Sequence, residues 1–513
     1  MNRRNFLRSS GLLGLPFMAS PLSAGMTNLL KQYVTPDSDR VLVLIQLSGG
    51  NDGLNTFIPL DHYATLMGLR ENLMIPENEL LDLTDDIALH PSMQGVQNLF
   101  NDGLIGAVQG VGYPNQNRSH FRSTDIWTSA SAANEIITTG WLGRNFQADH
   151  PEFPDTYPNE DYPAPFAIAI GSQVSQTCQG VGVNFSMAIN DPFNTTSLAV
   201  GGDTPVPETP YGDELRFLRT TIAQTNAYGG YIEDRVASGQ SMVDYPATRL
   251  AADLQKVAYM ISSGLETKVY VVNQGGYDTH AFQVVNGNPT TGIHADLLQT
   301  LSDAMAAFQA DMDAQGLGER VLSMTFSEFG RRIRSNDSLG SDHGSAAPLI
   351  LMGDCVMPGI LGQNPEISPD ADNQEGVAMQ YDFRDVYGSV LKDWFGLATD
   401  EVNTVLGHEY THLPVLRVCG EPSNTDELIA DLQAKIYPNP FANEVAISFT
   451  SSGVYTDLAV YDIVGKRVRH IFSRDLAAGA HRFRLSLGDL PAGPYVLRLQ
   501  AGVAVLSQRI LKQ

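Results

Sequence analysis

The stretch Val41-Leu-Val-Leu-Ile-Gln-Leu47, followed at once by Ser48-Gly-Gly-Asn-Asp-Gly-Leu-Asn55, contains the pattern that decides the fold. The first run is nearly all apolar, which is typical of a strand buried on both faces of a sheet. Glycines directly after a strand let the backbone turn sharply. Ligands of an open α/β sheet collect beyond the carboxyl ends of its strands, so the turn places Asp52 at a candidate site. A solvated turn aspartate is the alternative interpretation.

Further apolar runs alternate with amphipathic helical patterns along the chain. This alternation predicts an α/β domain in which a largely parallel sheet is covered by helices on both faces. The expected strands are 104–108, 166–170, 269–272, 321–326 and 349–352, and the expected helices are 91–100, 214–233, 247–263 and 293–314.

The composition limits the class of protein. With 513 residues, 43% hydrophobic and 17% charged, the chain can bury a large core, and disorder or a coiled coil is excluded for the chain as a whole. Its length allows about two to four domains. Asp and Glu outnumber Lys and Arg by 57 to 32, and the excess lies within 25–433, because 434–513 is basic on balance. A body this acidic repels nucleic acid and anionic membranes, whereas it favours bound cations.

The N-terminal residues have the order of an export signal. Arg3-Arg4 and Phe6-Leu7 precede an apolar run over 11–19 and small residues up to Ala24. We interpret 1–24 as a removable signal peptide, and its arginine pair resembles the twin-arginine type, which exports folded proteins. An ordinary secretory signal is the alternative. No other window has about 18 consecutive apolar residues, so we expect no transmembrane segment in the mature chain.

Cysteine is scarce. The three cysteines, Cys178, Cys355 and Cys419, have no C-x-x-C spacing. In an exported protein they allow at most one disulfide and leave at least one thiol unpaired. Buried small apolar positions are a better interpretation of them than metal ligands.

The pattern changes near the C-terminus. Residues 421–433 are the expected linker, and from 434 onward short alternating runs separated by Gly, Pro and Asp predict a small all-β sandwich over 434–513. Tyr437-Pro-Asn-Pro-Phe441, Tyr461-Asp-Ile-Val-Gly-Lys466 and Leu490-Pro-Ala-Gly-Pro-Tyr495 resemble the C-terminal sorting domain of type IX secretion substrates. That resemblance implies passage across an outer membrane, usually with removal of this domain. A generic sandwich that binds carbohydrate or protein is the alternative.

Three more polar clusters lie beside predicted strands. Asp278-Thr-His280 follows 269–272, Ser327-Glu328-Phe329 follows 321–326, and Ser341-Asp342-His343 precedes 349–352. Carboxylates and imidazoles at one sheet edge are suited to divalent cations. The sequence therefore predicts one or two divalent metal ions, with zinc, manganese or calcium as candidates, and the proposed ligands are Asp52, Asp278, His280, Glu328, Asp342 and His343.

The order of these clusters resembles the alkaline phosphatase superfamily, which includes phosphatases and sulfatases. The resemblance implies an alkaline phosphatase-like three-layer α/β/α sandwich over 25–420 and a two-metal site. Asp52 matches the aspartate of the first strand and His343 the late histidine. Two departures stand out: the gap from Asp278 to His280 is two residues instead of four, and Phe329 occupies a position where the family has a histidine.

A subfamily of exported proteins, domain of unknown function 1501, is a closer match. The resemblance runs from about residue 40 to 400 in the expected order. The strings that carry it are Gln46-Leu-Ser-Gly-Gly-Asn-Asp-Gly-Leu-Asn55, Ser119-His-Phe121, Thr139-Gly-Trp-Leu-Gly-Arg144, Gly275-Gly-Tyr-Asp-Thr-His280, Ser327-Glu-Phe-Gly-Arg331, Asp342-His-Gly344 and Asp382-Phe-Arg-Asp-Val-Tyr387.

Ser119 is the candidate nucleophile, because it precedes a predicted helix over 122–131 and superfamily nucleophiles head a helix. A helix N-cap without chemistry is the equal alternative. His120 is a further ligand or substrate contact, or else a structural hydrogen bonder. Arg144 and Arg331 are candidate clamps for an oxyanion, together with Arg122 and Arg332, although each can instead form a salt bridge. No Cys-x-Pro-x-Arg or Ser-x-Pro-x-Arg string is present, which disfavours a formylglycine sulfatase.

Together these features predict an exported metal-dependent hydrolase that acts on a phosphate or sulfate ester of a small molecule or polysaccharide. Its expected partners are the export and secretion machinery, and its expected route leads through the periplasm to the cell surface or medium. The alternative is a non-catalytic surface protein that keeps the fold and binds polysaccharide. The residue Phe329 favours that alternative, because it leaves a second metal site one imidazole short.

Overall fold

A computed structural model describes residues 39–199, 205–417, 434–451, 453, 455–461, 467–501 and 504–513. The predicted signal peptide, the predicted linker and most of the motif at 461–466 lie outside the described residues. Within the described residues, no helix is long and apolar enough to cross a membrane.

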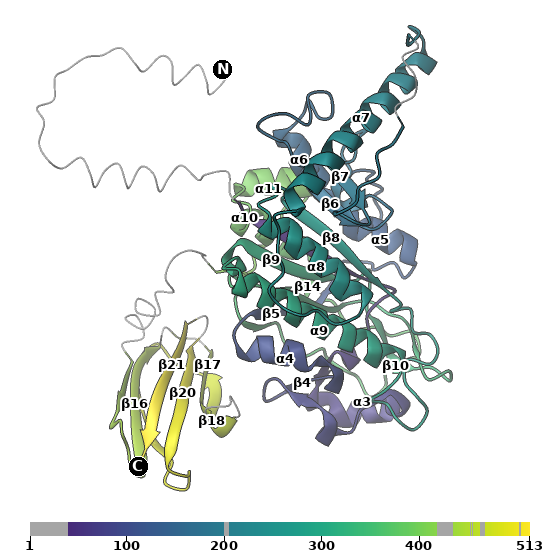
Figure 1. Cartoon of the computed structure of the whole chain (residues 1–513). Helices are drawn as coiled ribbons and strands as arrows, with labels where there is room; N and C mark the ends of the chain where they lie inside the picture. The colour runs from purple at the N-terminus through teal and green to yellow at the C-terminus, as the bar shows by residue number, and fades with distance from the viewer. Residues whose placement is uncertain are drawn as a thin grey trace, which may run out of the picture.

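One large sheet forms the centre of the α/β body (Figure 1). Its strands are β1 (Val41–Ser48), β5 (Ile105–Gly112), β6 (Ala167–Ile170), β7 (Ser186–Ile189), β8 (Val269–Gly275), β9 (Val321–Phe326), β12 (Ala347–Met352), β13 (Gly359–Leu361) and β14 (Tyr381–Asp382). Their order is β13-β5-β12-β9-β1-β8-β6-β7, with β14 also paired to β5. The paired strands are parallel except at β12, which runs antiparallel to β5 and β9.

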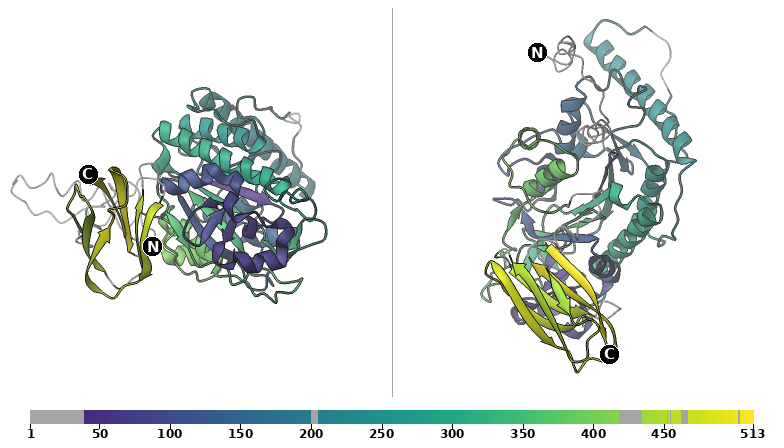
Figure 2. Two further views of the ribbon diagram at one scale, coloured as in Figure 1. Left: turned by 90° about the horizontal axis from the view of Figure 1, so that it is seen from below. Right: turned by 90° about the vertical axis from the view of Figure 1, so that its left-hand side faces the viewer.

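Helices cover both faces of this sheet, as Figures 1 and 2 show. Leu42 and Leu44 of β1 pack into one core with the helices of one face, whereas Val43 and Ile45 pack into a second core with the helices of the other. The first group is α5 (His120–Ser129), α6 (Trp141–Asp149), α10 (Phe383–Asp393) and α11 (Thr399–Leu406); the second is α4 (Gln94–Asn101), α8 (Arg249–Ser262) and α9 (Ile293–Ala314). The predicted three-layer α/β/α fold class is confirmed.

Several smaller elements surround these layers. The long helix α7 (Pro210–Val236) joins the second core only through its last turns and projects away from the sheet in Figure 1. The remaining elements are α3 (Tyr63–Arg70), the small sheet of β2 (Phe57–Pro59), β4 (Ile87–Leu89) and β3 (Leu81–Asp82), and the pair β10 (Arg331–Ser335) and β11 (Ser341–His343).

The strand directions gather the predicted polar clusters. The chain leaves β1, β5, β8 and β9 at the same edge of the sheet, because these strands are parallel to one another. Since β12 runs the other way, the chain reaches that edge just before β12, through β11. Segments that follow four strands and precede a fifth therefore meet at one place.

The last described residues of the α/β body are hydrogen-bonded to the segment after β12, at the edge of the sheet opposite the polar clusters. Val356, which follows β12, forms an isolated bridge with Leu416, and the N–H of Arg417 donates to the carbonyl oxygen of Cys355 at 2.8 Å. Cys355 is disulfide-bonded and Cys178 is a buried free thiol, whereas Cys419 lies outside the described residues.

The C-terminal region consists of antiparallel strands around a core of its own. One sheet contains β15 (Lys435–Tyr437), β16 (Glu444–Ser451) and β19 (Gly479–Ser486). The other contains β18 (Arg467–Asp475), β17 (Tyr455–Tyr461), β20 (Gly493–Ala501) and β21 (Ala504–Lys512). Buried side chains from both sheets, among them Phe449 and Leu497, fill the space between them, as expected for the predicted sandwich.

Candidate metal centre

Three imidazoles surround one carboxylate oxygen at the carboxyl edge of the sheet. His120 begins α5, His280 follows β8, and His343 ends β11. Their Nε2 atoms lie 3.4, 3.1 and 3.1 Å from Oδ1 of Asp278. One ligand atom from each of His120, Asp278 and His343 lies within 4.8 Å of the others, and His280 Nε2 approaches His343 Nε2 to 2.8 Å. We call these four residues the histidine cluster.

The Nδ1 atom of each imidazole in the cluster contacts an oxygen atom of another residue. His120 Nδ1 contacts Glu328 Oε1 at 2.8 Å, and His280 Nδ1 contacts Asp342 Oδ1 at 3.0 Å. His343 Nδ1 lies 2.7 Å from the carbonyl oxygen of Arg118. These oxygens are acceptors, so each Nδ1 carries the proton and each Nε2 presents its lone pair toward Asp278. Metal-binding histidines show this same arrangement.

The charge of the cluster suits a cation. Burial alone would raise the pKa of Asp278, but the hydrogen bond from Arg331, the contact with His343 and the nearby positive charge lower it to about 2. Burial, together with Arg331 and His120, lowers the pKa of His343 below its usual range despite its contacts with Asp278 and the carbonyl oxygen of Arg118. A carboxylate and a neutral imidazole are the protonation states that bind metal.

Glu328 and Asp342 stand behind the imidazoles, where they act as partners of Nδ1. Glu328 is buried and also accepts the backbone N–H of Gly49 at 2.8 Å. Asp342 accepts Arg332 Nη1 at 3.1 Å. The sequence predicted that both carboxylates bind the metal directly. In the structure each instead contacts the Nδ1 atom of a histidine and orients that ring.

Asp52 lies apart from the cluster in a fully buried ion pair. Arg70 Nη1 donates to its Oδ1 at 3.1 Å, Arg70 Nη2 donates to Oδ2, and Gln283 Nε2 donates to Oδ2 at 2.6 Å. Burial raises the pKa of Asp52, but Arg70 and the neighbouring groups outweigh it, so the net shift is downward. Both oxygens of Asp52 are thus engaged, which differs from its predicted role as a metal ligand. Its ion pair joins the first-strand loop to α3.

Arg331 braces the loops that carry the cluster. Its side chain is buried, and its Nη2 donates to Asp278 Oδ1 at 2.8 Å. It also donates to the carbonyl oxygens of Gly49, Gly50, Tyr277 and Ser341. Because its side chain is buried and bonded to four backbone carbonyls as well as to Asp278, Arg331 positions Asp278 and differs from the exposed oxyanion clamp of the prediction.

The other predicted arginines are occupied as well. Arg144 donates to the carbonyl oxygens of Ser129 and Thr139 at 2.8 Å, which fastens α6 to the end of α5. Arg122 donates to carbonyl oxygens that follow α5. In contrast, the guanidinium of Arg118 has no hydrogen bond or ion pair to any described residue, and sequence reasoning missed it although it stands directly before Ser119.

Close packing explains the paired glycines after β1 and the phenylalanine at position 329. A Cβ on Gly49, whose φ is +123°, would lie 2.3 Å from the backbone nitrogen of Asp278. A Cβ on Gly50 would lie 2.4 Å from the ring of Phe329. That buried ring packs against His120 and His343, with centroids 4.9 and 4.7 Å away. Phe329 thus packs against two rings of the histidine cluster and supplies no metal ligand.

An open cleft of about 500 Å³ lies beside the cluster. Ser119, the predicted nucleophile, is exposed at the N-terminal end of α5, and its hydroxyl makes no capping hydrogen bond. Phe121 stands 87% exposed at the cleft. The cleft is lined by Gln46, Ser48, Gly49, His120, Phe121, Thr124, Asp125, Gly275, Gly276, Asp278 and Glu328, which include no lysine or arginine.

Two family models match the chain. Residues 260–403 match the family described as "Protein of unknown function (DUF1501)", and residues 435–513 match the "Secretion system C-terminal sorting domain". These are the two families that the motifs resemble, although the first match covers only the second half of the expected range of about 40 to 400. No curated protein sequence matches the chain.

Several solved structures are similar in outline. The PsFucS1 sulfatase from Pseudoalteromonas sp. is 10% identical, with 91% of this chain and 88% of that chain covered and a TM-score of 0.32. A protein in the alkaline phosphatase superfamily from Vibrio parahaemolyticus is 9% identical, with 93% and 82% covered and a TM-score of 0.29. The phosphonate monoester hydrolase SpPMH from Silicibacter pomeroyi is 9% identical, with 92% and 89% covered and a TM-score of 0.31.

Proposed function

We propose that this secreted protein is a metal-dependent hydrolase that cleaves a phosphate or sulfate ester at the histidine cluster. One observation carries the proposal: three imidazoles, each fixed through Nδ1, direct their Nε2 atoms at Asp278 beside an open cleft. An arrangement that serves only the fold has no need to expose three converging lone pairs at the carboxyl edge of a sheet.

A single transition-metal ion of the zinc type fits these residues best. Imidazole nitrogen is a preferred ligand of zinc, whereas calcium takes oxygen ligands. Asp278, His120 and His343 would hold the ion, with His280 close to two of them. Asp52 and Phe329 supply nothing for a second ion. When bound, the ion would polarise the ester and activate a nucleophile at neutral pH.

The chain's own residues would do the remaining work. Glu328 and Asp342 keep His120 and His280 in the ligand tautomer, and Arg331 holds Asp278. Ser119 is the proposed nucleophile because its exposed hydroxyl directly precedes His120 at a helix N-terminus. A water molecule in the cleft is the alternative attacking group.

Arg118 is the group that we propose to bind the negative charge of the substrate. Its carbonyl oxygen holds His343, which keeps the residue at the cluster, and its guanidinium is without a partner among the described residues. Burial and the nearby charge of Arg332 lower the pKa of Arg118, and the carboxylate of Asp372 offsets part of this shift. An anionic oxygen between two guanidinium groups would relieve their repulsion and accept hydrogen bonds from both.

The test uses the full chain, purified with its metal content measured. We expect about one zinc-type ion per chain and turnover of aryl phosphate or aryl sulfate esters that chelation abolishes and zinc restores. Arg118→Ala should raise KM for these esters, while Arg216→Ala, in an exposed ion pair far along the chain, should not. Absence of turnover by fully metal-loaded protein toward both classes of ester would reject the proposal.

A non-catalytic surface protein remains the second candidate. It is favoured by the cleft lining, which contains Asp125, Asp278 and Glu328 but no cationic side chain to receive an anion. In that case the metal would organise the loops around the cleft, and the loaded protein would bind a polysaccharide without altering it. Glycan binding without release of sulfate or phosphate would support this candidate.

A further inference from the structure

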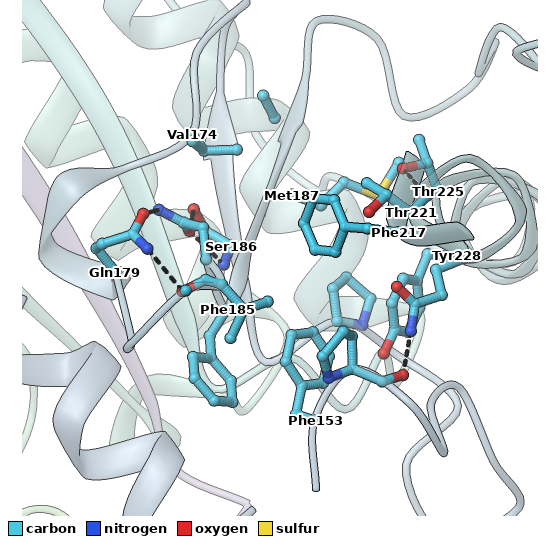
Figure 3. A pocket seen from close by; sticks show the side chains of 17 residues that line it. Phe153, Val174, Gln179, Phe185, Ser186, Met187, Phe217, Thr221, Thr225 and Tyr228 are labelled. Atoms are coloured by element: carbon cyan, nitrogen blue, oxygen red, sulfur yellow. Dashed lines mark hydrogen bonds between the residues drawn. The ribbon is translucent and has the colours of Figure 1, made fainter. Parts of the chain in front are cut away.

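The cleft at the histidine cluster differs in character from the second cavity of the body. The second cavity, shown in Figure 3, lies between α7 and the segments around β7, and its lining is mainly apolar. The two share no lining residue. Phe121 is the only apolar side chain among the described residues that line the cleft, and the others are polar residues or glycines. The cleft therefore offers a ligand one apolar surface with polar groups around it.

Helix α5 presents this apolar ring together with polar groups on one face. Phe121, Thr124 and Asp125 all line the cleft, and their spacing of three and four residues places them on one side of the helix. The other side packs into the body, where Ile126 and Trp127 are buried. That burial fixes the orientation of α5 and leaves the ring of Phe121 87% exposed, although contact of an apolar ring with water is unfavourable.

Two polar side chains of the cleft have no partner in the part of the chain that the structure describes. The carboxylate of Asp125 accepts no hydrogen bond and forms no ion pair, and the side-chain amide of Gln46, on β1, makes no hydrogen bond. The other two carboxylates of the lining, Asp278 and Glu328, are engaged within the histidine cluster. The cleft thus keeps one carboxylate and one amide free for a ligand.

A sugar ring matches this combination of groups. One face of a pyranose carries C–H groups, which pack against the electron-rich face of an aromatic ring, while its edge carries hydroxyls. Two adjacent hydroxyls donate to the two oxygens of a carboxylate, and a third pairs with an amide. Because the cleft is open, it also admits a sugar residue that belongs to a longer chain.

We propose that this cleft binds a carbohydrate as the alcohol part of the ester, with its sugar ring stacked on Phe121 and its hydroxyls bonded to Asp125 and Gln46. The inference rests on the proposed function, because it places the sugar that carries the phosphate or sulfate group beside the histidine cluster. Phe121 and Asp125 then select the alcohol part of the ester, whereas the metal and Arg118 bind its anionic part.

Titration calorimetry with neutral sugars tests the role of the ring. The probes are the hexasaccharides of galactan, mannan, xylan and laminarin, added to the full zinc-loaded chain. We expect at least one to bind, and Phe121→Ala to weaken it about tenfold or more while Phe121→Trp keeps the affinity. The control is Tyr211→Ala, which removes a ring 70% exposed at the start of α7 and outside the cleft lining. Binding of none of the four, or equal affinity in Phe121→Ala, would overturn the proposal.

A second pair of variants tests the carboxylate. Asp125→Ala should weaken the same hexasaccharide about tenfold or more, because hydrogen bonds to a charged group are lost. Asp244→Ala, at an exposed position outside the cleft lining, should change the affinity less than about twofold. Hexalysine is the competing probe, since a cationic peptide would also pair with Asp125, and its binding would weaken steeply as salt is added. Hexalysine binding that exceeds that of every hexasaccharide and depends on Phe121 would replace the sugar with a cationic peptide.

Turnover separates this inference from the proposed function. Cleavage of aryl esters without binding of any hexasaccharide would reject the sugar and keep the hydrolase. Binding of a hexasaccharide that depends on Phe121, without cleavage of any ester by the metal-loaded chain, would keep the sugar site and reject the hydrolase.

Discussion

Nε2 of His280 lies 2.8 Å from Nε2 of His343, and both rings donate their Nδ1 proton to another acceptor. Two nitrogen lone pairs at this distance repel each other, so the arrangement requires a proton or a cation between or beside them. With Asp278 Oδ1 at 3.1 Å from each ring, a divalent cation satisfies all three groups together.

Removing one imidazole should remove the metal. His343→Ala is expected to lower the zinc content of the purified chain from about one equivalent to near zero, because it deletes a ligand nitrogen. Elemental analysis after dialysis against a weak chelator measures this. The control is His412→Gln, an exposed histidine paired with Asp393 outside the cluster, which should keep its full metal content. Equal metal content in both variants would contradict the cluster as the binding site.

Glu328 should act through His120. Glu328→Ala is expected to weaken zinc binding by about 10 to 100-fold, because the imidazole loses the acceptor that fixes its tautomer. Glu328→Gln keeps an oxygen acceptor for Nδ1 and should recover much of this affinity. Competition with a fluorescent zinc chelator gives both constants. If the two variants lose affinity equally, the role of Glu328 is not the orientation of His120.

The nucleophile can be separated from the metal site by one substitution. Ser119→Ala should abolish turnover while leaving the zinc content unchanged, since the hydroxyl attacks and holds no ion. Single-turnover kinetics with an aryl phosphate or aryl sulfate, together with metal analysis, measure both quantities. Retained turnover would assign the attack to a water molecule in the cleft.

Breaking the buried ion pair of Asp52 should be costly. Arg70→Ala is expected to lower the free energy of unfolding by about 3 to 5 kcal/mol, because it leaves a buried carboxylate without its counter-ion. Guanidinium chloride unfolding measures the change. Arg216→Ala, which breaks an exposed pair with Asp213, should lower it by about 0 to 1 kcal/mol. A loss for Arg70→Ala as small as that control would show that the pair is not a structural brace.

Two buried histidines should make the body acid-sensitive. Burial lowers the pKa of His90 to about 3 and that of His294 to about 4, both below the usual value near 6.5. Between about pH 6.5 and 4 the unfolded chain therefore binds protons that the folded chain does not, so stability falls as the pH falls through this window. His294→Gln should flatten the slope, whereas exposed His412→Gln should not. Stability that is constant from pH 7 to 4 would contradict the shifts.

The sequence was sufficient for the position of the site but not for its internal roles. Apolar runs that end in glycine and polar residues predicted which strand ends meet, and Asp278, His280 and His343 do meet there. The partner of Asp52 could not be predicted, because Arg70 stands 18 residues later on a separate helix. Whether a carboxylate binds a cation or orients a histidine depends on distances of about an ångström, which spacing does not encode.

His120 is a residue whose role in the site the sequence underestimated. As a lone histidine in the sequence it pointed more strongly to a structural role, but its position at the first residue of α5 brings it to Glu328 across 208 residues of chain. The short helices α6, α10 and α11 were not predicted either, although their buried faces complete one core of the body. The second cavity depends on how α7 packs, and no local pattern indicated it.

The hydrogen bonds between the segment after β12 and the end of the α/β body lie at the edge of the sheet opposite the histidine cluster. Residues 355–357 and 415–417 are joined at the edge of the sheet where β1 begins, and the histidine cluster lies at the edge where β1 ends. A pull on the chain at Arg417 would be carried by these hydrogen bonds, without passing through the loops that hold Asp278. A molecule tethered from that end would therefore bear mechanical load on one side while its cleft faces the surroundings on the other.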